Sequence, residues 1–363
     1  MKHGGDIYTD GLLVGKELLD FSSNVNPMPI SKVYRQHVAE ALDRIHLYPD
    51  AEYRELKTNL IEYIIKSRQY FKRDSIKDGY VPSQEEILVG NGASELLDLV
   101  IGSLKSITIV VPSFIEYKIN AERHNLNMNF SHLNKEFNYD YDDIMMKIKS
   151  TEGIIIGNPN NPNGNIIDHK EFKRILDYCE ENNKIVIIDE AFIEFVLNNN
   201  QSFIDDVKEY NCLVIIRAIT KFYSMAGVRF GYGITKNKKI LNHIRKNQNP
   251  WSVNCFAEVA VKYALFDEEF IEKSIDWILK ERLWMYEELE KVPYIKWVGH
   301  SFGNYHLCEL KDMTSEELCN KLKSQGILIR NCDNYEGLNN RYVRIAVKER
   351  EKNMQLIKAL NLI

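Results

Sequence analysis

The fold of this chain is constrained most by a series of short apolar segments that alternate with helical segments. The apolar segments begin near residues 87, 107, 154, 185, 213 and 228. Runs of Ile, Val and Leu without polar alternation are typical of strands that are buried on both faces. Strands joined through helices form parallel sheets, because a crossover connection needs the length of a helix. We therefore predict an α/β fold with a three-layer large domain, in which a mainly parallel sheet lies between two layers of helices.

The rest of the 363-residue chain is long enough for a second, smaller domain. Strand-like segments near residues 305, 327 and 342 alternate with helical segments that start at residues 314 and 350, which predicts a compact α+β unit. The first 30 residues are rich in Gly, Asn, Ser and Pro and predict a loop-like arm. Residues 31–47 predict a single helix, which Tyr48-Pro49-Asp50 ends. We therefore expect an arm over residues 1–30, a large domain over 31–265 and a small C-terminal domain over 266–363.

Composition and charge argue against several classes of function. The chain has 47 Lys and Arg against 52 Asp and Glu, with no basic tract, so we expect no nucleic-acid partner. The N-terminal residues lack an apolar signal core and no apolar run approaches the length of a membrane span, so we expect a cytoplasmic protein without membrane contact. The six cysteines form no Cys-x-x-Cys pair, which argues against structural zinc or a disulfide framework and favours free thiols. We expect no bound metal.

The stretch from Ile215 to Tyr232, IIRAITKFYSMAGVRFGY, places a lysine where a strand ends and a loop opens. Thr220 and Lys221 stand at the end of the strand, and Arg229 follows eight residues after the lysine. An amine that can join an aldehyde, next to a fixed cation for an anionic group, suits pyridoxal phosphate. Most lysines after strands are simply solvated, so position alone leaves both readings open.

Other strand ends carry residues that suit the same chemistry. The turn Gly90-Asn91-Gly92 precedes a helix, whose free N–H groups can hold a phosphate, although a plain turn fits equally well. Phe114 follows a strand and can stack on a flat cofactor or serve in packing. The segment NPNNPNG, residues 158–164, predicts a rigid turn that presents an amide. Asp189 ends an apolar strand and can pair with a protonated ring nitrogen or cap a helix.

Two further groups of residues are candidates for binding a substrate. Arg330 and Arg344 stand in strand-like segments, where they either face solvent or bind an anion. The N-terminal arm is either a flexible tail or a segment folded over a pocket, to which it supplies His3, Gly4 and Asn24.

Taken together and in this order, these motifs resemble the fold-type I pyridoxal-phosphate enzymes, specifically the class I/II aminotransferase family. The resemblance implies that Lys221 binds the cofactor aldehyde covalently, that Asp189 pairs with the pyridinium nitrogen, and that Asn161 contacts the phenolic oxygen. It also implies a homodimer, because members of this family commonly lend the tyrosine at position 48 to the neighbouring subunit. The residues that the resemblance places around the cofactor are Tyr48, Gly92, Ala93, Ser94, Phe114, Asn161, Asp189, Thr220, Lys221 and Arg229.

Within this family, two branches are similar to the chain, and several motifs favour one of them. HGGD at the start, DFSSNVNP, DEAF, TKFY and IRNCDNYEGL resemble threonine-phosphate decarboxylases of cobalamin biosynthesis more than histidinol-phosphate aminotransferases. The resemblance implies decarboxylation of L-threonine O-3-phosphate to aminopropanol phosphate, with a histidinol-phosphate or related aminotransferase as the alternative. The residues that it implies for the small phosphorylated substrate are His3, Gly4, Asn24, Asn161, Arg330 and Arg344.

Three residues depart from the pattern of these branches. Ala218 stands where both branches usually have Ser or Thr, which removes a hydroxyl from the expected phosphate site. Phe192 lacks the phenol that aminotransferases usually direct at the cofactor. Asp6 replaces an asparagine and is expected to add negative charge near the substrate phosphate.

Overall fold

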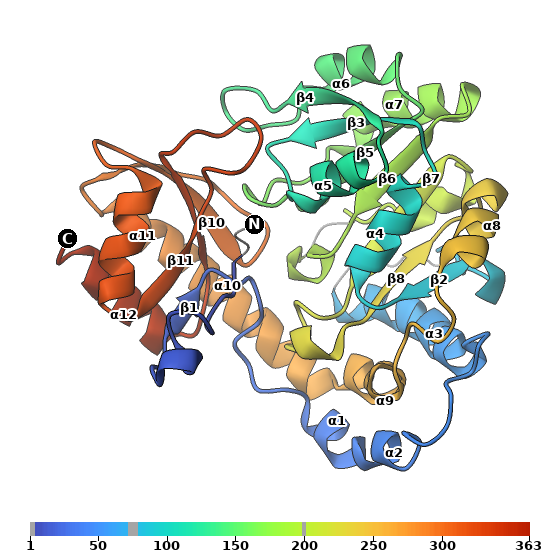
Figure 1. Ribbon diagram of the computed structural model, residues 1–363, viewed down its shortest axis with the longest axis horizontal. Helices are drawn as coiled ribbons and strands as arrows, with labels where there is room; N and C mark the ends of the chain where they lie inside the picture. The colour runs from blue at the N-terminus through green and yellow to red at the C-terminus, as the bar shows by residue number, and fades with distance from the viewer. Residues whose placement is uncertain (1–3, 72–78, 198–200) are drawn as a thin grey trace.

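The computed structural model describes residues 4–71, 79–197 and 201–363, and its larger sheet has seven strands (Figure 1). The strand order is β2-β8-β7-β6-β5-β3-β4. Pairing is parallel from β4 through β7, and β8 runs antiparallel between β7 and β2, so the prediction of a mainly parallel sheet is confirmed. The strands are β2 (Ile87–Gly90), β3 (Ser106–Val111), β4 (Asn127–His132), β5 (Gly153–Gly157), β6 (Ile185–Asp189), β7 (Leu213–Ala218) and β8 (Gly231–Ile234).

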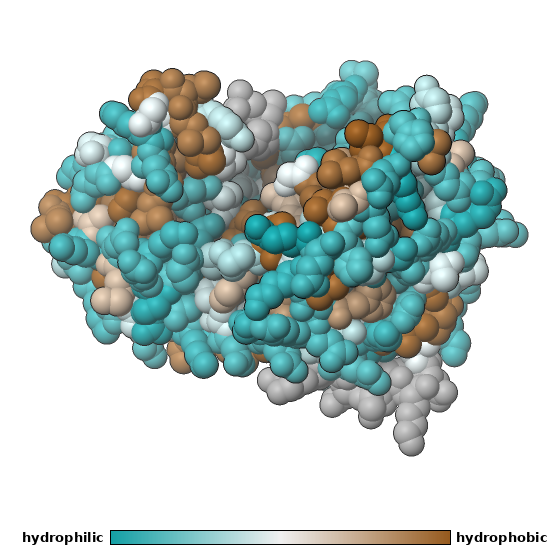
Figure 2. All heavy atoms as spheres, turned by 90° about the horizontal axis from the view of Figure 1, so that it is seen from below, coloured by the Kyte–Doolittle hydropathy of each residue, from teal (hydrophilic) through white to brown (hydrophobic). Residues whose placement is uncertain are grey.

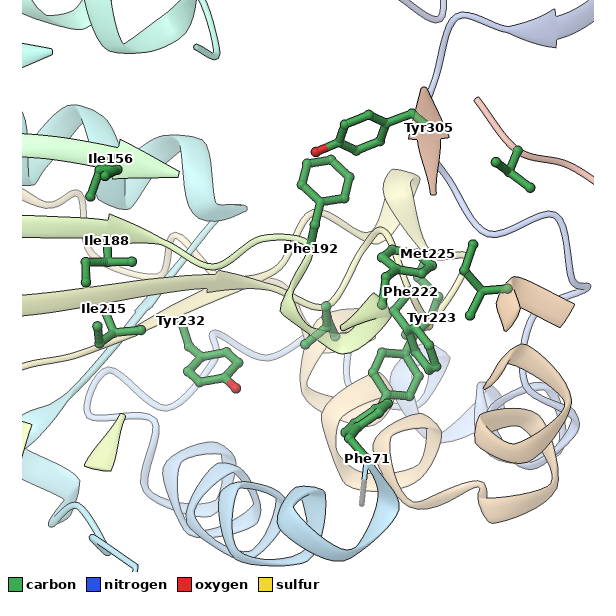
Figure 3. Packing of buried hydrophobic residues seen from close by; sticks show 14 of the residues in the cluster. Phe71, Ile156, Ile188, Phe192, Ile215, Phe222, Tyr223, Met225, Tyr232 and Tyr305 are labelled. Atoms are coloured by element: carbon green, nitrogen blue, oxygen red, sulfur yellow. The ribbon is translucent and has the colours of Figure 1, made fainter. Parts of the chain in front are cut away.

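Helices cover both faces of this sheet, because alternate strand residues point to opposite sides. Ile155 and Ile187 pack with one group of helices, whereas Ile156, Ile188 and Ile215 pack with the other. Figure 3 shows the latter three side by side on neighbouring strands. The first group comprises α4 (Ala93–Ile101), α5 (Glu116–Arg123) and α8 (Lys238–Asn247), and the second α3 (Arg54–Tyr70), α6 (Tyr141–Ile148), α7 (His169–Glu181) and α9 (Cys255–Tyr263). The result is the predicted three-layer arrangement.

A second sheet of five strands lies beside the first and has the order β1-β11-β12-β10-β9 (Figure 1). Its strands are β1 (Leu19–Phe21), β9 (Ile295–Val298), β10 (Tyr305–Leu310), β11 (Ile327–Asn331) and β12 (Tyr342–Ala346). The helices that pack with it are α10 (Glu268–Glu290), α11 (Ser315–Ser324) and α12 (Arg350–Leu360). Strands and helices therefore form the α+β unit expected of the C-terminal part. Short 3₁₀ helices occur at Leu12–Val14, Gln84–Glu86, Ile193–Phe195, Asp205–Lys208, Ala226–Val228 and Ala264–Phe266.

Two predictions for the N-terminal part are wrong. Residues 1–30 are not all loop-like, because Leu19–Phe21 pairs in parallel with β11 as an edge strand of the smaller sheet. Three residues are too few to show a strand pattern in the sequence. The single helix predicted over 31–47 is instead two short helices, α1 (Lys32–His37) and α2 (Ala39–Leu42). Ile45 and Leu47 are mostly exposed, so no burial stabilises further helical turns. Among the described residues, no helix is both long and apolar enough to cross a membrane.

A buried ion pair connects β7 of the larger sheet to the loop that follows β6. Arg217 on β7 donates to Glu190 at 2.8 Å and 2.9 Å, and these side chains are 1% and 0% exposed. The hydroxyl of Ser202 and the backbone N–H of Phe203 also donate to this carboxylate, so its oxygens are well supplied with donors.

We expect Arg217→Met to destabilise the protein by about 3–5 kcal/mol, because Glu190 would keep a buried charge without its cation. Urea denaturation followed by circular dichroism measures the change. The matched control is Lys173→Met, which breaks a mostly exposed pair with Asp177 and should cost less than about 1 kcal/mol. Equal losses in the two variants would contradict the prediction.

Candidate active site

A cavity of about 240 Å³ lies at the carboxyl ends of the central strands, where the two sheets meet. Ligands in open α/β sheets bind at this edge, because the loops that follow the strands converge there. The cavity is lined by thirteen of the residues predicted for the site: Gly4, Asn24, Gly92, Ala93, Ser94, Phe114, Asn161, Asp189, Thr220, Lys221, Arg229, Arg330 and Arg344. The sequence spreads these residues over 341 positions, and the fold brings them to one place.

Lys221 stands on the loop that follows β7, and the N-terminal segment holds this loop in place. The backbone N–H of Asn26 donates to the carbonyl of Lys221 at 3.0 Å. The Asn26 side chain donates to the next carbonyl, that of Phe222, at 2.7 Å. Burial lowers the pKa of the Lys221 amine to about 8, and the positive charges of Arg344 and Arg229 add to the shift. A substantial fraction of this amine is therefore neutral and nucleophilic near neutral pH.

This lowered pKa predicts how attachment of pyridoxal phosphate to the cofactor-free protein depends on pH. Only the neutral amine attacks an aldehyde, so the rate should rise about tenfold per pH unit below pH 8 and level off above it. A lysine at its ordinary pKa of 10.5 would give a rate that still rises past pH 9 and pH 10. The rate of increase of visible absorption after mixing measures this. A continued rise through pH 10 would contradict the environment described for Lys221.

Asp189 is the last residue of β6 and presents a buried carboxylate to the cavity. Its Oδ2 accepts a hydrogen bond from the hydroxyl of Tyr117 at 2.7 Å, and its Oδ1 accepts one from the N–H of Ala191 at 2.9 Å. Burial raises the pKa of the Asp189 carboxyl, and these two hydrogen bonds oppose the shift. A buried carboxylate is stabilised by a cation, and a protonated ring nitrogen in the cavity would supply one.

The turn where α4 begins is a candidate anion site. Gly92 has φ +83°, and the next two residues open the helix, so free backbone N–H groups face the cavity. A Cβ on Gly92 would lie 2.7 Å from Nη2 of Arg229, which places the guanidinium against this turn. A Cβ on Gly231 would lie 2.2 Å from the nitrogen of Ala93, so only glycine lets β8 come this close to the helix start. N–H groups and a guanidinium that converge in this way fit a phosphate.

The opposite end of the cavity holds two arginines. Arg344 donates from Nη2 to the carbonyl of Ser22 at 2.7 Å and from Nη1 to Oδ1 of Asn161 at 2.5 Å. Among the described residues, neither its buried Nε nor the buried Oδ1 of Asn24 has a hydrogen-bond partner. Arg330 donates to Oδ1 of Asn334 at 2.8 Å. A buried donor without a partner at a cavity wall is available to a ligand.

The residues that depart from the family pattern have different outcomes. Phe192 and Ala218 both line the cavity. Figure 3 shows the ring of Phe192 next to that of Tyr305. The two rings pack edge-on with their centroids 5.2 Å apart, so Phe192 contributes a wall without a polar group. Asp6 does not line the cavity. It is exposed and accepts hydrogen bonds from the N–H groups of Tyr8 and Thr9, which lower its pKa, so the expected charge near the substrate is wrong.

One of the described residues predicted for the site does not line the cavity within this chain. Tyr48 is 80% exposed and packs against Trp251 at 4.6 Å between ring centroids, on a different part of the surface. His3 lies outside the described residues.

Sequence reasoning missed two tyrosines that line the cavity. Tyr117 follows Phe114 by three residues, and the two rings meet edge-on at 5.8 Å. That spacing is one helical turn and could have indicated it. Tyr335 stands on the loop between β11 and β12 and is 4% exposed. No local pattern indicates that this loop turns toward the larger sheet.

The fold and the residues of the cavity together indicate a class of protein. A lysine amine of lowered pKa, a buried carboxylate and an anion site in one α/β cavity suit a pyridoxal-phosphate enzyme. The model of the family "Aminotransferase class I and II" matches residues 16–360, and the chain belongs to this family. The enzyme therefore depends on pyridoxal phosphate.

Individual relatives support the family and divide between two activities. Threonine-phosphate decarboxylase of Salmonella typhimurium is 31% identical over 99% of this chain and 95% of its own length. Histidinol-phosphate aminotransferase of Methanocaldococcus jannaschii is 28% identical over 95% and 89%. The crystal structure of the histidinol-phosphate aminotransferase from Clostridium acetobutylicum is 43% identical and has a TM-score of 0.86, with 94% and 98% of the two chains covered.

Proposed function

We propose that this enzyme decarboxylates L-threonine O-3-phosphate to aminopropanol phosphate. The observation that carries the proposal is a pair of arginines in the cavity of Lys221. Arg330 and Arg344 stand directly opposite each other on neighbouring antiparallel strands, and each is 5% exposed. In the described part of the chain, no carboxylate forms an ion pair with either of them. Two desolvated cations are costly without counter-charge, so the site suits a substrate that brings two anionic groups.

Each of these residues would have a separate role in such a reaction. Bound pyridoxal phosphate withdraws electrons from whichever bond of the substrate α-carbon stands perpendicular to its ring. Asp189 holds a proton on the ring nitrogen and thereby maintains that withdrawal. Arg344 binds the α-carboxylate and Arg330 the phosphate, so their placement decides which bond is perpendicular. With the α-carboxylate held by Arg344 in that orientation, its loss as CO2 would be favoured, and Lys221 would supply the proton that replaces it on the α-carbon.

The N-terminal arm supports the decarboxylase branch, because its two decarboxylase-like motifs meet at this cavity. The N–H of Gly5 donates to the hydroxyl of Ser22 at 2.6 Å. A Cβ on Gly4 would lie 2.3 Å from the carbonyl oxygen of Ser22, so glycine allows the two segments to touch. The same carbonyl accepts from Arg344. Gly4 and Gly5 therefore contact Ser22, whose carbonyl binds the arginine that we assign to the carboxylate.

A second candidate is an aminotransferase that acts on histidinol phosphate or a related amino acid with 2-oxoglutarate. The observation in its favour is the 43% identity with the Clostridium acetobutylicum structure. The same two arginines would also bind a dicarboxylate or a phosphorylated amine. The residues that line the cavity are therefore compatible with both reactions.

One assay separates the two candidates. The enzyme loaded with pyridoxal phosphate is incubated with L-threonine O-3-phosphate in the absence of any 2-oxo acid, and CO2 and aminopropanol phosphate are measured. We expect both products in equal amounts over many turnovers. Glutamate formation that requires 2-oxoglutarate, with no CO2, would reject the decarboxylase. Histidinol phosphate with 2-oxoglutarate is the parallel test of the alternative.

We also propose that the enzyme is a homodimer in which Tyr48 serves the partner's cavity. Exposed apolar residues gather on α2 and the loop that follows it: Leu42, Ile45, Leu47 and Tyr48, with Trp251 packed against the last. Figure 2 views the molecule from the side on which α1, α2 and α9 lie in Figure 1, and groups of hydrophobic residues interrupt its hydrophilic surface. Such patches are typical of interfaces. Sedimentation equilibrium should give twice the mass of the chain, and a monomer at micromolar concentration would contradict the proposal.

The predicted cytoplasmic location also remains a proposal. All six cysteines lie in described segments and all are free, which supports a reducing compartment.

A further inference from the structure

Tyr335 joins three of the residues assigned to substrate and cofactor. Its ring faces the guanidinium of Arg330, 5.2 Å from the ring centroid. Its hydroxyl lies 3.4 Å from Nη1 of Arg344 and 3.5 Å from Oδ1 of Asn161. The side chain is 4% exposed and lines the same cavity as Lys221. A single tyrosine therefore touches both arginines, with a different part of the side chain at each.

The positive charges of Arg330 and Arg344 repel each other, so a side chain is needed to hold the two guanidinium groups apart. They stand opposite each other in the register of β11 and β12, so their like charges emerge from neighbouring backbone positions. A ring face attracts a guanidinium without neutralising it and without using its N–H donors. The ring of Tyr335 can thus hold Arg330 while leaving its charge for a ligand.

The hydroxyl of Tyr335 acts on the other arginine. It accepts from Nη1 of Arg344 and donates to the amide oxygen of Asn161, which also accepts directly from Arg344. These two contacts are long and individually weak. Together with the bond from Nη2 to the carbonyl of Ser22, they fix the plane of the guanidinium, whose buried Nε has no partner in the part of the chain that the structure describes.

The loop that carries Tyr335 is fastened on both sides of the cavity. Asn334 accepts from Arg330 at 2.8 Å, and Glu336 pairs with Lys118 of α5 at 2.7 Å. A Cβ on Gly337 would lie 3.3 Å from the ring of His132, next to the end of β3. The position of Tyr335 is therefore set by contacts to both sheets.

We propose that Tyr335 sets the relative placement of Arg330 and Arg344 and thereby makes the cavity selective for substrates with two anionic groups. It is a positioning residue with two separable parts. The ring acts on the arginine assigned to the phosphate, and the hydroxyl acts on the arginine assigned to the carboxylate. This inference rests on the proposed function and adds the residue that determines its specificity.

Binding measurements on three variants of the enzyme loaded with pyridoxal phosphate test the proposal. Tyr335→Leu removes the ring, Tyr335→Phe removes only the hydroxyl, and Tyr294→Phe is a control that removes a hydroxyl bonded to the carbonyl of Leu360, outside the cavity. The probes are O-phospho-L-threonine and L-threonine. Their dissociation constants are read from the change in visible absorption within the first turnover, before product accumulates.

We expect one Tyr335 variant to change the preference between the two probes and the other to change the affinity for both. Tyr335→Leu should lower the preference for phosphothreonine over threonine roughly tenfold, because Arg330 loses its ring contact. Tyr335→Phe should weaken both probes by a similar factor, roughly three- to tenfold, and keep the preference of the wild type. Tyr294→Phe should change neither. The assignment would be overturned if Tyr335→Leu kept the preference for phosphothreonine over threonine, or if Tyr335→Phe lost it. If Tyr335→Leu folds poorly, Tyr335→Phe alone still tests the proposal.

The outcome for the wild type distinguishes this inference from the proposed function. A wild type that prefers phosphothreonine but transfers its amino group would contradict decarboxylation and leave the role of Tyr335 intact. A wild type that binds the two probes equally would overturn both.

Discussion

Replacing Lys221 with alanine should lower kcat by at least about 10⁴-fold, the order of loss seen when a covalent catalytic group is removed. In the proposed function this amine both attaches the cofactor and moves a proton at the α-carbon. The variant should stay folded. Burial disfavours the charged form of this amine and lowers its pKa, so replacing it with alanine removes an unfavourable desolvation. Turnover with L-threonine O-3-phosphate and the visible absorption of the cofactor-loaded protein measure both effects.

Lys236→Ala is the matched control for this variant. Lys236 also follows a threonine at the end of a strand, β8, but it donates to the carbonyl of Lys208 and does not line the cavity. It should keep wild-type turnover. A Lys221→Ala protein with more than a tenth of wild-type activity would contradict the assignment.

Asp189→Asn should lower kcat about 10²- to 10³-fold while leaving the cavity in shape. An adjacent opposite charge raises the pKa of a ring nitrogen by about 1–3 units, so its removal lowers the protonated fraction by up to about 10³-fold. Asparagine also has one oxygen for two donors, the hydroxyl of Tyr117 and the N–H of Ala191. One of them loses its acceptor, which should reduce the stability of the cofactor-free protein by about 1–3 kcal/mol.

Two readouts separate the electronic effect of Asp189 from a structural one. The pH at which the visible spectrum of the bound cofactor changes should move in Asp189→Asn, which a merely structural lesion would not cause. Asp168→Asn is the control, because Asp168 caps α7 outside the cavity and asparagine caps helices equally well. An unchanged spectrum together with an unchanged kcat would contradict pairing between Asp189 and the ring nitrogen.

The larger sheet could be predicted because its central strands are continuous apolar runs. β5, β6 and β7 are buried on both faces, so their sequences contain little except Ile, Val and Leu. β4 reads NMNFSH and was missed, since an edge strand pairs on one side only and tolerates polar residues. β1 was missed because its three residues gain stability only from pairing with a strand more than 300 positions away.

The site could be predicted in part for a related reason. Residues at the end of a strand or within three residues of it, such as Phe114, Asp189 and Lys221, are placed by the parallel sheet itself. Tyr117 and Tyr335 are placed by tertiary contacts. Tyr335 reaches the cavity only because its loop spans from β11 to the ends of the larger sheet, and no local sequence pattern encodes that path. The prediction for Asp6 is wrong in the opposite sense, because its carboxylate accepts hydrogen bonds from Thr9 and does not line the cavity.

The central claim is that this cavity holds pyridoxal phosphate joined covalently to Lys221. Incubation with the cofactor, reduction with borohydride, proteolysis and mass spectrometry test it directly. We predict one reduced phosphopyridoxyl group per chain, on the peptide that contains Lys221, with loss of that label in Lys221→Ala. A label spread over surface lysines, or no label on that peptide, would contradict the account.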